Sequence, residues 1–421
     1  MMDASPRVLR PNRDQLELRP TDLESLLPED HRARAVWEFV EGLDLTPLYE
    51  RIRSVEGQAG RPAIDPAILM ALWLYATVEG VGSARALARL CEQHDAYRWI
   101  CGGVSVNAHT LSDFRVKHEA VLDELLTKSV ARLMEAGLVT LRRVSQDGMR
   151  VRASAGAASF RRRKRLREFE KEARQQVEAL RRELDEDPAA TTRRQTEARL
   201  RAAKDRQARV KRALSEMPSV EAKKGPEEKP NARVSTTDPE ARVMRMADGG
   251  YRPAYNVQFA TDPASQVIVG VEVTNEGSDQ GQLEPMLDQL EERYGVTPAD
   301  ALVDGGFINL EGIERIENRG CRIYGPVPTP RDPDRNPHRP LPHDAPAVAR
   351  WRKRMGRATA KEIYKLRAAT SECVNAIARN RGLRQLTVRG RRKVRAVALW
   401  YVLAQGMMRG FALQEAALEA G

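Results

Sequence analysis

The sequence is poor in cysteine and aromatic residues, and it has no long uninterrupted apolar run. Its four cysteines stand far apart and form no Cys-x-x-Cys pair, which argues against a zinc finger and a disulfide scaffold. They are Cys91, Cys101, Cys321 and Cys373. Aromatic residues make up only 5% of the chain, which leaves little for an RNA-binding domain that stacks bases on exposed rings.

Membrane and secretory signals are also scarce. The longest apolar stretch, residues 68–78, is well short of the roughly 20 apolar residues that cross a bilayer, so it predicts a buried helix. The first residues, MMDASPRVLRPNRDQ, contain no apolar signal-peptide core. We therefore expect a cytoplasmic protein with no membrane partner. Its 421 residues suggest roughly two to four domains.

Basic residues are in excess, and they are concentrated in two segments. The chain has 70 Lys and Arg against 59 Asp and Glu. Residues 161–214 hold 19 basic and 10 acidic side chains, and residues 350–395 hold 16 and 2. This arrangement is typical of polyanion binding, although a solvated helical face is an alternative for 161–214. Nucleic acid is favoured over a membrane surface, because an interfacial helix needs a cleaner apolar face.

Residues 1–135 are predicted to form an all-α, helix-turn-helix-like DNA-binding domain. We expect short helices at Pro66 to Glu79, Ser83 to Glu92 and Thr110 to about Glu119, with Ser83 as an N-cap and Thr110 opening a capping box. Helix, glycine-containing turn and helix give the outline of a helix-turn-helix unit, an outline shared by any small helical bundle. Candidate phosphate or groove contacts in this domain are Arg98, Arg115 and Lys117.

Residues 155–233 are predicted to form a basic helical insertion. Apolar residues recur at spacings of three and four from Leu166 to Leu184 and again from Leu200 to Leu214. The segment DEDPAATT (185–192) separates the two stripes, and PSVEAKKGPEEKP (218–230) follows as a linker. The pattern predicts an antiparallel helical hairpin, with low-complexity disorder as the alternative.

Residues 136–154 and 234–421 predict one α/β domain that the insertion interrupts. TLRRVSQDGMRVRAS (140–154) is expected to be extended around a glycine turn, and YNVQFAT and VIVGVEV to form a hairpin. Short strands are expected at 301–303 and 322–324, with helices between and after them. Without the insertion, the order is β-β-β-α-β-α-β-α, which is that of an RNase-H-like fold.

Carboxylates stand at three corresponding points of such a fold. The ends of its first and fourth strands lie side by side, and a later helix faces both. Asp147 is expected at the end of the first strand and Asp304 at the end of the fourth. Glu362 and Glu372 both fall on the predicted helix at 360–380, and we prefer Glu372 because more basic residues surround it.

Three converging carboxylates indicate a metal site. They cannot all stay ionised without cations between them, and oxygen ligands select Mg²⁺ or Mn²⁺ over zinc. Two such ions, roughly 3.5–4 Å apart, activate the attacking oxygen and stabilise the leaving oxygen in phosphodiester displacement. Each acid alone is more often structural than catalytic. It is their joint placement beside a basic tract that indicates nuclease chemistry.

Several sequence blocks resemble those of bacterial insertion-sequence DDE transposases, over nearly the whole chain. The N-terminal blocks are RPAIDPAILMALWLYATVEGVGSARALARL and HTLSDFR. VSQDGMRV resembles the first-Asp block, STTDPEARVM and YRPAYNVQFATD the strands that follow, and ALVDGGF the second-Asp block. IYKLRAATSECVNAIARNRGLRQLTVRG resembles the Tyr, Arg, Glu, Lys signature around the third acid.

The resemblance implies roles for individual residues. Asp147, Asp304 and Glu372 would be the catalytic acids and the ligands of two Mg²⁺ or Mn²⁺ ions, and Arg379 stands where the family's Lys usually is. Four residues separate Arg367 from Glu372, where the signature often has three. The expected DNA contacts, including those from the basic tract, are Tyr364, Arg367, Arg379, Arg381, Arg384, Arg389, Arg391 and Arg392, with Arg115 and Lys117.

The sequence therefore predicts a transposase that binds the terminal inverted repeats of an insertion sequence and cuts and joins DNA strands. We expect double-stranded DNA as its partner and a homodimer or larger assembly on DNA. Two alternatives stay open: an RNase-H-like nuclease that cuts without joining, and a non-catalytic regulator descended from a transposase. Asn256 and Gln258 share one face of their strand, where they either line the DNA side of the site or face solvent.

Overall fold

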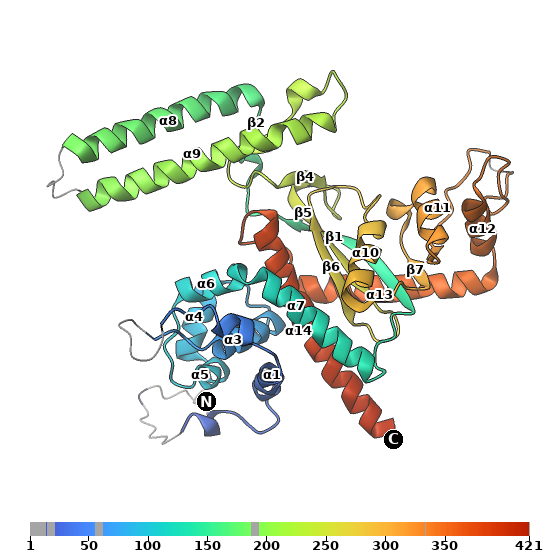
Figure 1. The fold of residues 1–421 in the computed structure, drawn as a ribbon, viewed down its shortest axis with the longest axis horizontal. Coiled ribbons are helices and arrows are strands. Elements are labelled where there is room, and N and C mark those ends of the chain that lie inside the picture. Colours follow the sequence, from blue (N-terminus) through green and yellow to red (C-terminus); the bar gives the residue numbers. More distant parts are fainter. Residues whose placement is uncertain (1–13, 15–21, 55–61, 187–192, 333, 421) are drawn as a thin grey trace, which may run out of the picture.

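The computed structural model describes residues 14, 22–54, 62–186, 193–332 and 334–420. A helical N-terminal region is followed by an α/β domain, and a long helical hairpin projects from that domain (Figure 1). The last helix of the chain runs past both the helical region and the sheet.

Seven helices form the N-terminal region, after a short 3₁₀ turn at Glu24–Leu26. They are α1 (Arg32–Glu41), α2 (Thr46–Tyr49), α3 (Pro66–Val78), α4 (Ala84–Gln93), α5 (Asp95–Cys101), α6 (Ala108–Lys117) and α7 (Glu119–Glu135). Helix α3 begins where Asp65 accepts a hydrogen bond from the Ala67 amide, with Pro66 in its first turn. It is apolar on all sides because other helices surround it, as the sequence predicted.

The predicted helix starts are only partly confirmed. Ser83 caps α4 as expected, through a bond from the Ala86 amide. Helix α6 begins earlier than predicted, because Asn107 and not Thr110 is the cap: the Asn107 side chain accepts from the Thr110 amide. Helices α5 and α7 were not predicted individually.

The α/β domain is built on a six-stranded mixed sheet. Its strands are β1 (Arg143–Arg152), β4 (Arg242–Arg245), β5 (Tyr251–Thr261), β6 (Ile268–Thr274), β7 (Asp300–Leu302) and β8 (Arg322–Tyr324). The order is β4-β5-β1-β7-β8, and β6 also pairs with β5. Strand β5 is antiparallel to β1, β4 and β6, whereas β7 is parallel to β1 and β8.

The glycine turn predicted within residues 140–154 is absent from the structure. Strand β1 is continuous and pairs with β5 from Ser145 to Arg152, with Gly148 opposite Gln258. The Asp-Gly pair therefore lies in the middle of a strand, because the long partner β5 holds this segment extended on both sides of the glycine.

Helices cover both faces of the sheet. Helices α13 (Ala358–Asn380) and α14 (Arg391–Ala420) pack on one face, against β1 and β6 respectively. Helices α10 (Leu283–Tyr294) and α11 (Leu310–Asn318) lie beside each other on the opposite face, joined by the Arg315–Glu284 ion pair, and α12 (Pro346–Met355) packs on α11. Side chains of β1 and β5 alternate between these two layers.

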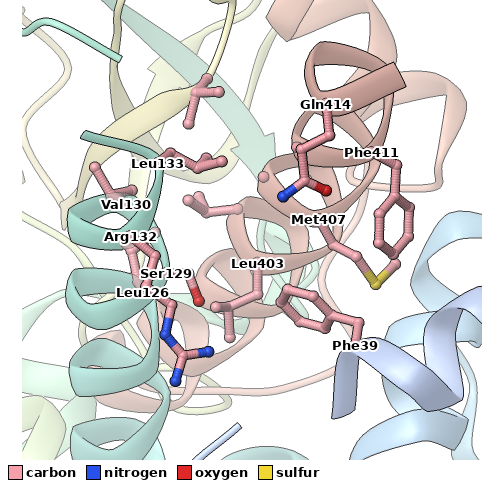
Figure 2. A pocket seen from close by; sticks show the side chains of 14 residues that line it. Phe39, Leu126, Ser129, Val130, Arg132, Leu133, Leu403, Met407, Phe411 and Gln414 are labelled. Carbon is pink, nitrogen blue, oxygen red and sulfur yellow. The ribbon is translucent and has the colours of Figure 1, made fainter. Parts of the chain in front are cut away.

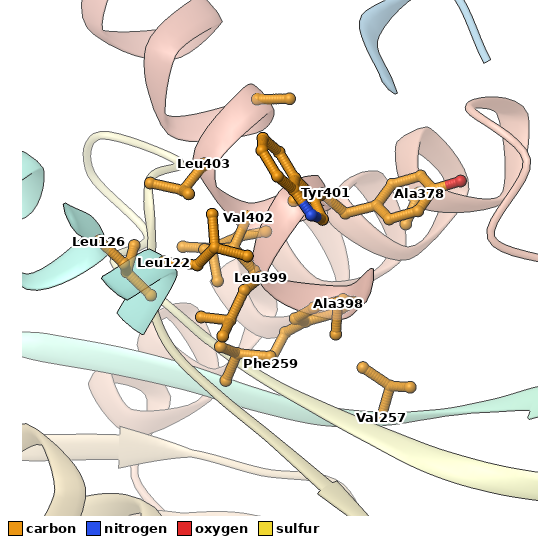
Figure 3. Close-up of a cluster of buried hydrophobic side chains, with 14 of the residues drawn as sticks. Leu122, Leu126, Val257, Phe259, Ala378, Ala398, Leu399, Tyr401, Val402 and Leu403 are labelled. Atoms are coloured by element: carbon orange, nitrogen blue, oxygen red, sulfur yellow. The ribbon is translucent and has the colours of Figure 1, made fainter. Parts of the chain in front are cut away.

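One hydrophobic core extends through the N-terminal region and the sheet, and α14 is its centre. Leu399 and Val402 of α14 lie among Leu122 of α7 and Phe259 of β5 (Figure 3). Trp400 contacts Trp73 of α3 at 6.4 Å between ring centroids. The segment Arg391–Glu419 is long and apolar enough to cross a membrane, but its most apolar window is 67% buried within the protein. Its apolar composition is thus explained by its place in the core.

The helical hairpin predicted for the insertion is confirmed. It consists of α8 (Arg163–Glu186) and α9 (Arg193–Ala222), and the separating residues 187–192 lie outside the described residues. Two small hydrophobic clusters hold it, one around Leu166 and Met217 at its base and one around Val177 and Leu200 farther out. The linker predicted from residue 218 begins later, because Pro218 lies inside α9. The short strands β2 (Phe160–Arg161) and β3 (Val234–Ser235) pair where the hairpin joins the domain.

Candidate active site

Asp147 and Asp304 occupy equivalent positions on neighbouring strands. The parallel pairing of β1 with β7 ends where Ser145 meets Leu302. Asp147 stands two residues further along β1, and Asp304 stands two residues past the end of β7. Parallel neighbours are about 4.8 Å apart, so this register brings the two acids to one edge of the sheet. The structure thus brings together two of the three acids predicted, although Asp147 is within β1 and not at its end.

The carboxylate of Asp147 is held by helix α13. The Asn375 side chain donates to one carboxylate oxygen at 2.9 Å, and Arg367 lies 4.0 Å from that same oxygen. Burial raises the pKa of Asp147 to about 6, and the negative charges of Asp304 and Asp279 act in the same direction, while Arg367 opposes them. The Asp147 carboxylate is therefore costly to ionise in this buried position, even with Arg367 beside it.

Glu372 lies on the same helix, beside the side chains that face Asp147. Ser371 bonds Ser145 of β1 at 2.8 Å, and Asn375 bonds Asp147, so this stripe of α13 faces the strand. Successive helical residues are turned by about 100°, which places Glu372 about 60° from Asn375 around the helix. Its side chain is exposed at the rim of the site.

Glu362, the other acid predicted for this helix, is far from Asp147. It stands 13 residues before Asn375, about 20 Å along a helix that rises 1.5 Å per residue. Its side chain pairs with Lys365 at 2.7 Å in solvent. The structure therefore favours Glu372 over Glu362 as the third acid.

Within the described residues, no three His, Cys, Asp or Glu side chains are gathered closely enough to form a complete metal site. The groups that are present nevertheless suit a divalent cation. Burial is the main cause of the raised pKa of Asp147, the nearby charge of Asp304 adds to it, and both aspartates offer the oxygen atoms that Mg²⁺ prefers. The buried Oδ1 of Asn375 accepts no hydrogen bond, so a further oxygen is unpaired beside Asp147.

The sequence analysis missed a third aspartate at this site, Asp279. It is 3% exposed and lies on the sheet face opposite α13. Asn256 and Gln258 of β5 each donate to its Oδ1 at 2.7 Å, and Arg150 of β1 pairs with its Oδ2 at 2.7 Å. Of the two alternatives for Asn256 and Gln258, exposure to solvent is wrong, since both are almost fully buried. The sequence placed them on one face of their strand, but nothing in it indicated the acid that they hold.

Gly148 makes this arrangement possible. A β-carbon at this position would lie 2.1 Å from Asp279 Oδ1 and 2.4 Å from Gln258 Nε2. These distances leave no space for any side chain, so the Asp279 carboxylate reaches the backbone directly beside Asp147. Gly306 is also close to two carboxylates. A β-carbon at this position would lie 3.0 Å from Asp304 Oδ1 and 3.7 Å from Asp279 Oδ2.

Arg115 is removed from the predicted DNA contacts, because it is a buried structural residue. Its guanidinium is 8% exposed, donates to the Gly82 carbonyl at 2.6 Å and lies over the Trp73 ring at 4.8 Å. Burial lowers its pKa to about 10. Its guanidinium also donates to the Thr387 hydroxyl. This hydrogen bond joins the N-terminal region to the segment after α13.

The remaining predicted DNA contacts lie in different surroundings. Arg367 and the half-buried Tyr364 are beside Asp147, and Arg381 is partly buried between α13 and α14 with its carbonyl accepting from Tyr401. Lys117 and Arg98 are exposed but paired with Asp113 and Asp95. The exposed arginines that follow the third acid are Arg379, Arg384, Arg389, Arg391 and Arg392.

An apolar pocket of about 160 Å³ lies elsewhere, between α1, α7 and α14 (Figure 2). Phe39, Leu126, Leu403 and Phe411 line it, and Arg132 is the one charged residue in its wall. It has no acid to serve as a base or a metal ligand, so it is not a second catalytic site.

Two protein-family models match the chain. A transposase domain (DUF772) matches residues 21–117, and a transposase DDE domain matches residues 226–405. No curated protein and no solved structure matches it. The DDE match includes Asp304 and Glu372 and the strand that holds Asp279 in place. The chain is an insertion-sequence DDE transposase, as the sequence resemblance predicted.

Proposed function

We propose that this transposase binds the terminal inverted repeats of its element and cuts and joins DNA strands at Asp147, Asp304 and Glu372. The observation that carries the proposal is the position of Asp147. It lies on the central strand, in register with Asp304, and is bonded to the helix that bears Glu372. Apart from the short β4, the sheet has three antiparallel strands (β6, β5 and β1) followed by two parallel ones (β7 and β8), which supports an RNase-H-like fold for this domain.

Asp147, Asp304 and Glu372 would hold two Mg²⁺ or Mn²⁺ ions. When bound, such ions lower the pKa of the attacking water or hydroxyl and neutralise charge on the leaving oxygen. Asn375 keeps one oxygen of Asp147 in place, and Arg367 provides positive charge on the side from which a phosphate would approach. Asp279 joins β1 to β5 through its guanidinium and amide partners and lies close to the Gly306 turn, which would help to fix the spacing of Asp147 and Asp304.

The rest of the assembly follows from the same proposal. Exposed arginines after the third acid would contact DNA phosphates, and the N-terminal region would recognise the repeats. Two element ends must meet for joining, so we propose a homodimer or larger assembly on double-stranded DNA. The site of action would be the bacterial cytoplasm, where that DNA lies.

The test is strand cleavage and joining on labelled duplexes that carry the DNA flanking this gene, with Mg²⁺ or Mn²⁺. Wild type is compared with Asp147→Asn, Asp304→Asn and Glu372→Gln, and Glu362→Gln is the matched control. We expect wild type and Glu362→Gln to cut and join, while the three other variants bind DNA and do neither. Active Glu372→Gln protein would remove the third ligand from the proposal. Wild-type protein that cuts without joining would be a nuclease, and one that binds without cutting would be a regulator.

A further inference from the structure

Two open pockets meet at the base of the helical hairpin. The first, about 530 Å³, is lined by Arg152 at the end of β1, by residues 153–157 and by Arg252 of β5. The second, about 370 Å³, is lined by Arg206 and Arg209 of α9. Thr237 and Arg389 line both pockets. We call this continuous surface the arginine groove, defined by Arg152, Arg206, Arg209, Arg252, Arg389 and Thr237.

Among the described residues, three of the five arginines that define the groove have unused donors, whereas Arg206 and Arg252 pair with Glu172 and Asp248. Arg389 is anchored by its Nε, which donates to the Ser154 carbonyl at 3.2 Å, and its two terminal nitrogens donate to no other group within the described chain. Across the same described ranges, Arg152 and Arg209 form no ion pair with an acid. A guanidinium fixed at one nitrogen, with the others open, is well suited to grip a phosphate with two parallel hydrogen bonds.

The charge of the hairpin is concentrated at this groove. Residues 161–173 and 206–222, which form its base, hold 11 basic and 5 acidic side chains. Residues 174–205, which form its outer part, hold 8 basic and 7 acidic side chains. Most outer charges are thus compensated within the hairpin, as in the Arg174–Glu178 and Arg199–Glu183 pairs. The uncompensated charge lies where the hairpin meets the sheet, and not along its length.

One wall of the groove is made of small residues, Ala153 to Ala157. A β-carbon on Gly156 would meet nothing within 4 Å, so open space lies above this segment. In the part of the chain that the structure describes, the backbone amides of Ala155 and Gly156 donate no hydrogen bond. A wall of this kind lets a sugar-phosphate backbone approach closely and offers it main-chain donors.

Strand β1 connects the groove to the carboxylates. Arg152 stands five residues after Asp147 on a continuous strand, which corresponds to about 17 Å at 3.4 Å per residue. Each strand of B-DNA has one phosphate per roughly 3.4 Å of helix axis, so 17 Å spans about five nucleotides of a duplex whose axis runs along β1. We propose that the arginine groove holds the backbone of the duplex that is cut, about five nucleotides from the scissile phosphate. The assignment to the duplex that is cut rests on the proposed function of the carboxylate site. Binding of a polyanion in the groove does not depend on it.

The first experiment measures affinity for a labelled 40-base-pair duplex without metal, over a range of salt concentrations. The groove variant carries Arg152→Gln, Arg209→Gln and Arg389→Gln. The control carries Arg181→Gln, Arg194→Gln and Arg201→Gln, which remove the same charge from the outer hairpin. Each phosphate contact contributes about one to the slope of log affinity against log salt, so we expect the groove variant to lose about three and to bind roughly 10–1000-fold more weakly. The control should keep the wild-type slope.

Equal losses in the two triple variants would overturn the groove, because general charge would then explain binding. Thermal unfolding shows whether either triple variant has lost its fold. If one has, the binding measurement is repeated with its single substitutions. Wild-type protein that binds no DNA would instead overturn the proposed function, since this assay needs no catalysis.

The second experiment maps the contacted phosphates by ethylation interference on the element end. We expect interference about five nucleotides from the cut with wild type, and its loss with the groove variant. A groove variant that cuts normally but fails to join would show that the groove holds target DNA, which would overturn its assignment to the duplex that is cut.

Discussion

The carboxylate site and the arginine groove lie at two points of the same strand, and they are built in opposite ways. Around Asp147 the polar groups are buried, paired with one another and packed so closely that Gly148 has no room for a methyl group. In the groove the arginines are mostly exposed, and several of their nitrogens have no partner within the described chain. The first site is arranged before DNA arrives, whereas the second offers donors that DNA would complete.

This difference predicts which kind of substitution should affect each of the two sites. A preorganised site is sensitive to atomic displacement, because a misplaced ligand changes the geometry of the reaction. An open basic surface is sensitive to charge and salt, because its binding depends on neutralised phosphates. Steric changes should therefore affect cutting at the carboxylates, and charge changes should affect DNA affinity at the groove.

The strongest test of this contrast is Gly148→Ala. Its methyl group would meet the Asp279 carboxylate at 2.1 Å, so the strand or the aspartate must move. We expect cutting to fall by 100-fold or more, roughly the effect of a 1 Å misplacement, and the free energy of unfolding to fall by about 1–3 kcal/mol. DNA affinity and its salt dependence should not change. Gly312→Ala in α11, where a methyl group has room, is the control; an active Gly148→Ala protein would contradict the tight packing.

Asp279→Asn should have the next largest effect. Asparagine can keep its oxygen toward the donors of Asn256 and Gln258, but its NH₂ group then faces Arg150, which also loses its counter-charge. Asp279 acts as a positioning residue, so we expect a loss of about 10–100-fold in the cutting rate with unchanged DNA affinity. A raised metal concentration for half-maximal cutting would accompany it, and a purely structural role would leave that value alone. Asp288→Asn, which removes an exposed acid paired with Arg319, provides the comparison.

Stability in the absence of metal should depend on pH through Asp147. Its pKa is raised to about 6 in the folded protein from an ordinary value of 3.8, so folding favours the protonated form. That stabilisation is present below about pH 4 and is lost as the pH rises through about 6, with an upper bound of about 3 kcal/mol. Thermal unfolding at pH 5 and pH 7.5 should therefore differ less in Asp147→Asn than in wild type. If Mg²⁺ failed to restore wild-type stability at pH 7.5, the metal assignment would be weakened.

The smallest effect is expected from shortening the hairpin. Replacing residues 174–205 with a short glycine-serine turn removes the outer cluster around Val177 and Leu200 but keeps the base cluster around Leu166 and Met217. Since the removed residues carry almost no net charge, DNA affinity should stay within about threefold of wild type. A large loss in a binding titration would place the DNA contacts on the outer hairpin and not at its base.

The sequence predicted the parts of this site that depend on local patterns. The end of a predicted strand indicated Asp304, and the heptad-like stripes predicted the hairpin. The strand-strand-helix order predicted that Asp147 lies beside α13. It did not predict that Asp147 lies mid-strand, because an Asp-Gly pair favours a turn until a long partner strand pairs on both sides of it. We predicted no role for Asp279 and a DNA contact for Arg115. Both are buried against segments far away in the sequence, and those segments decide what each of them contacts.

The position of α14 has a consequence for synthesis of the protein. Residues 391–420 are translated after every element they pack against, including α3, α7 and β6. Trp400, for example, packs near the Trp73 ring and donates a hydrogen bond to the Arg115 carbonyl. Both residues stand more than 280 positions earlier in the chain. The core around α3 therefore stays incomplete until α14 has left the ribosome. A frameshift or stop codon before α14 should abolish folding of the N-terminal region as well, so a truncated copy of the gene would leave no stable fragment of that region.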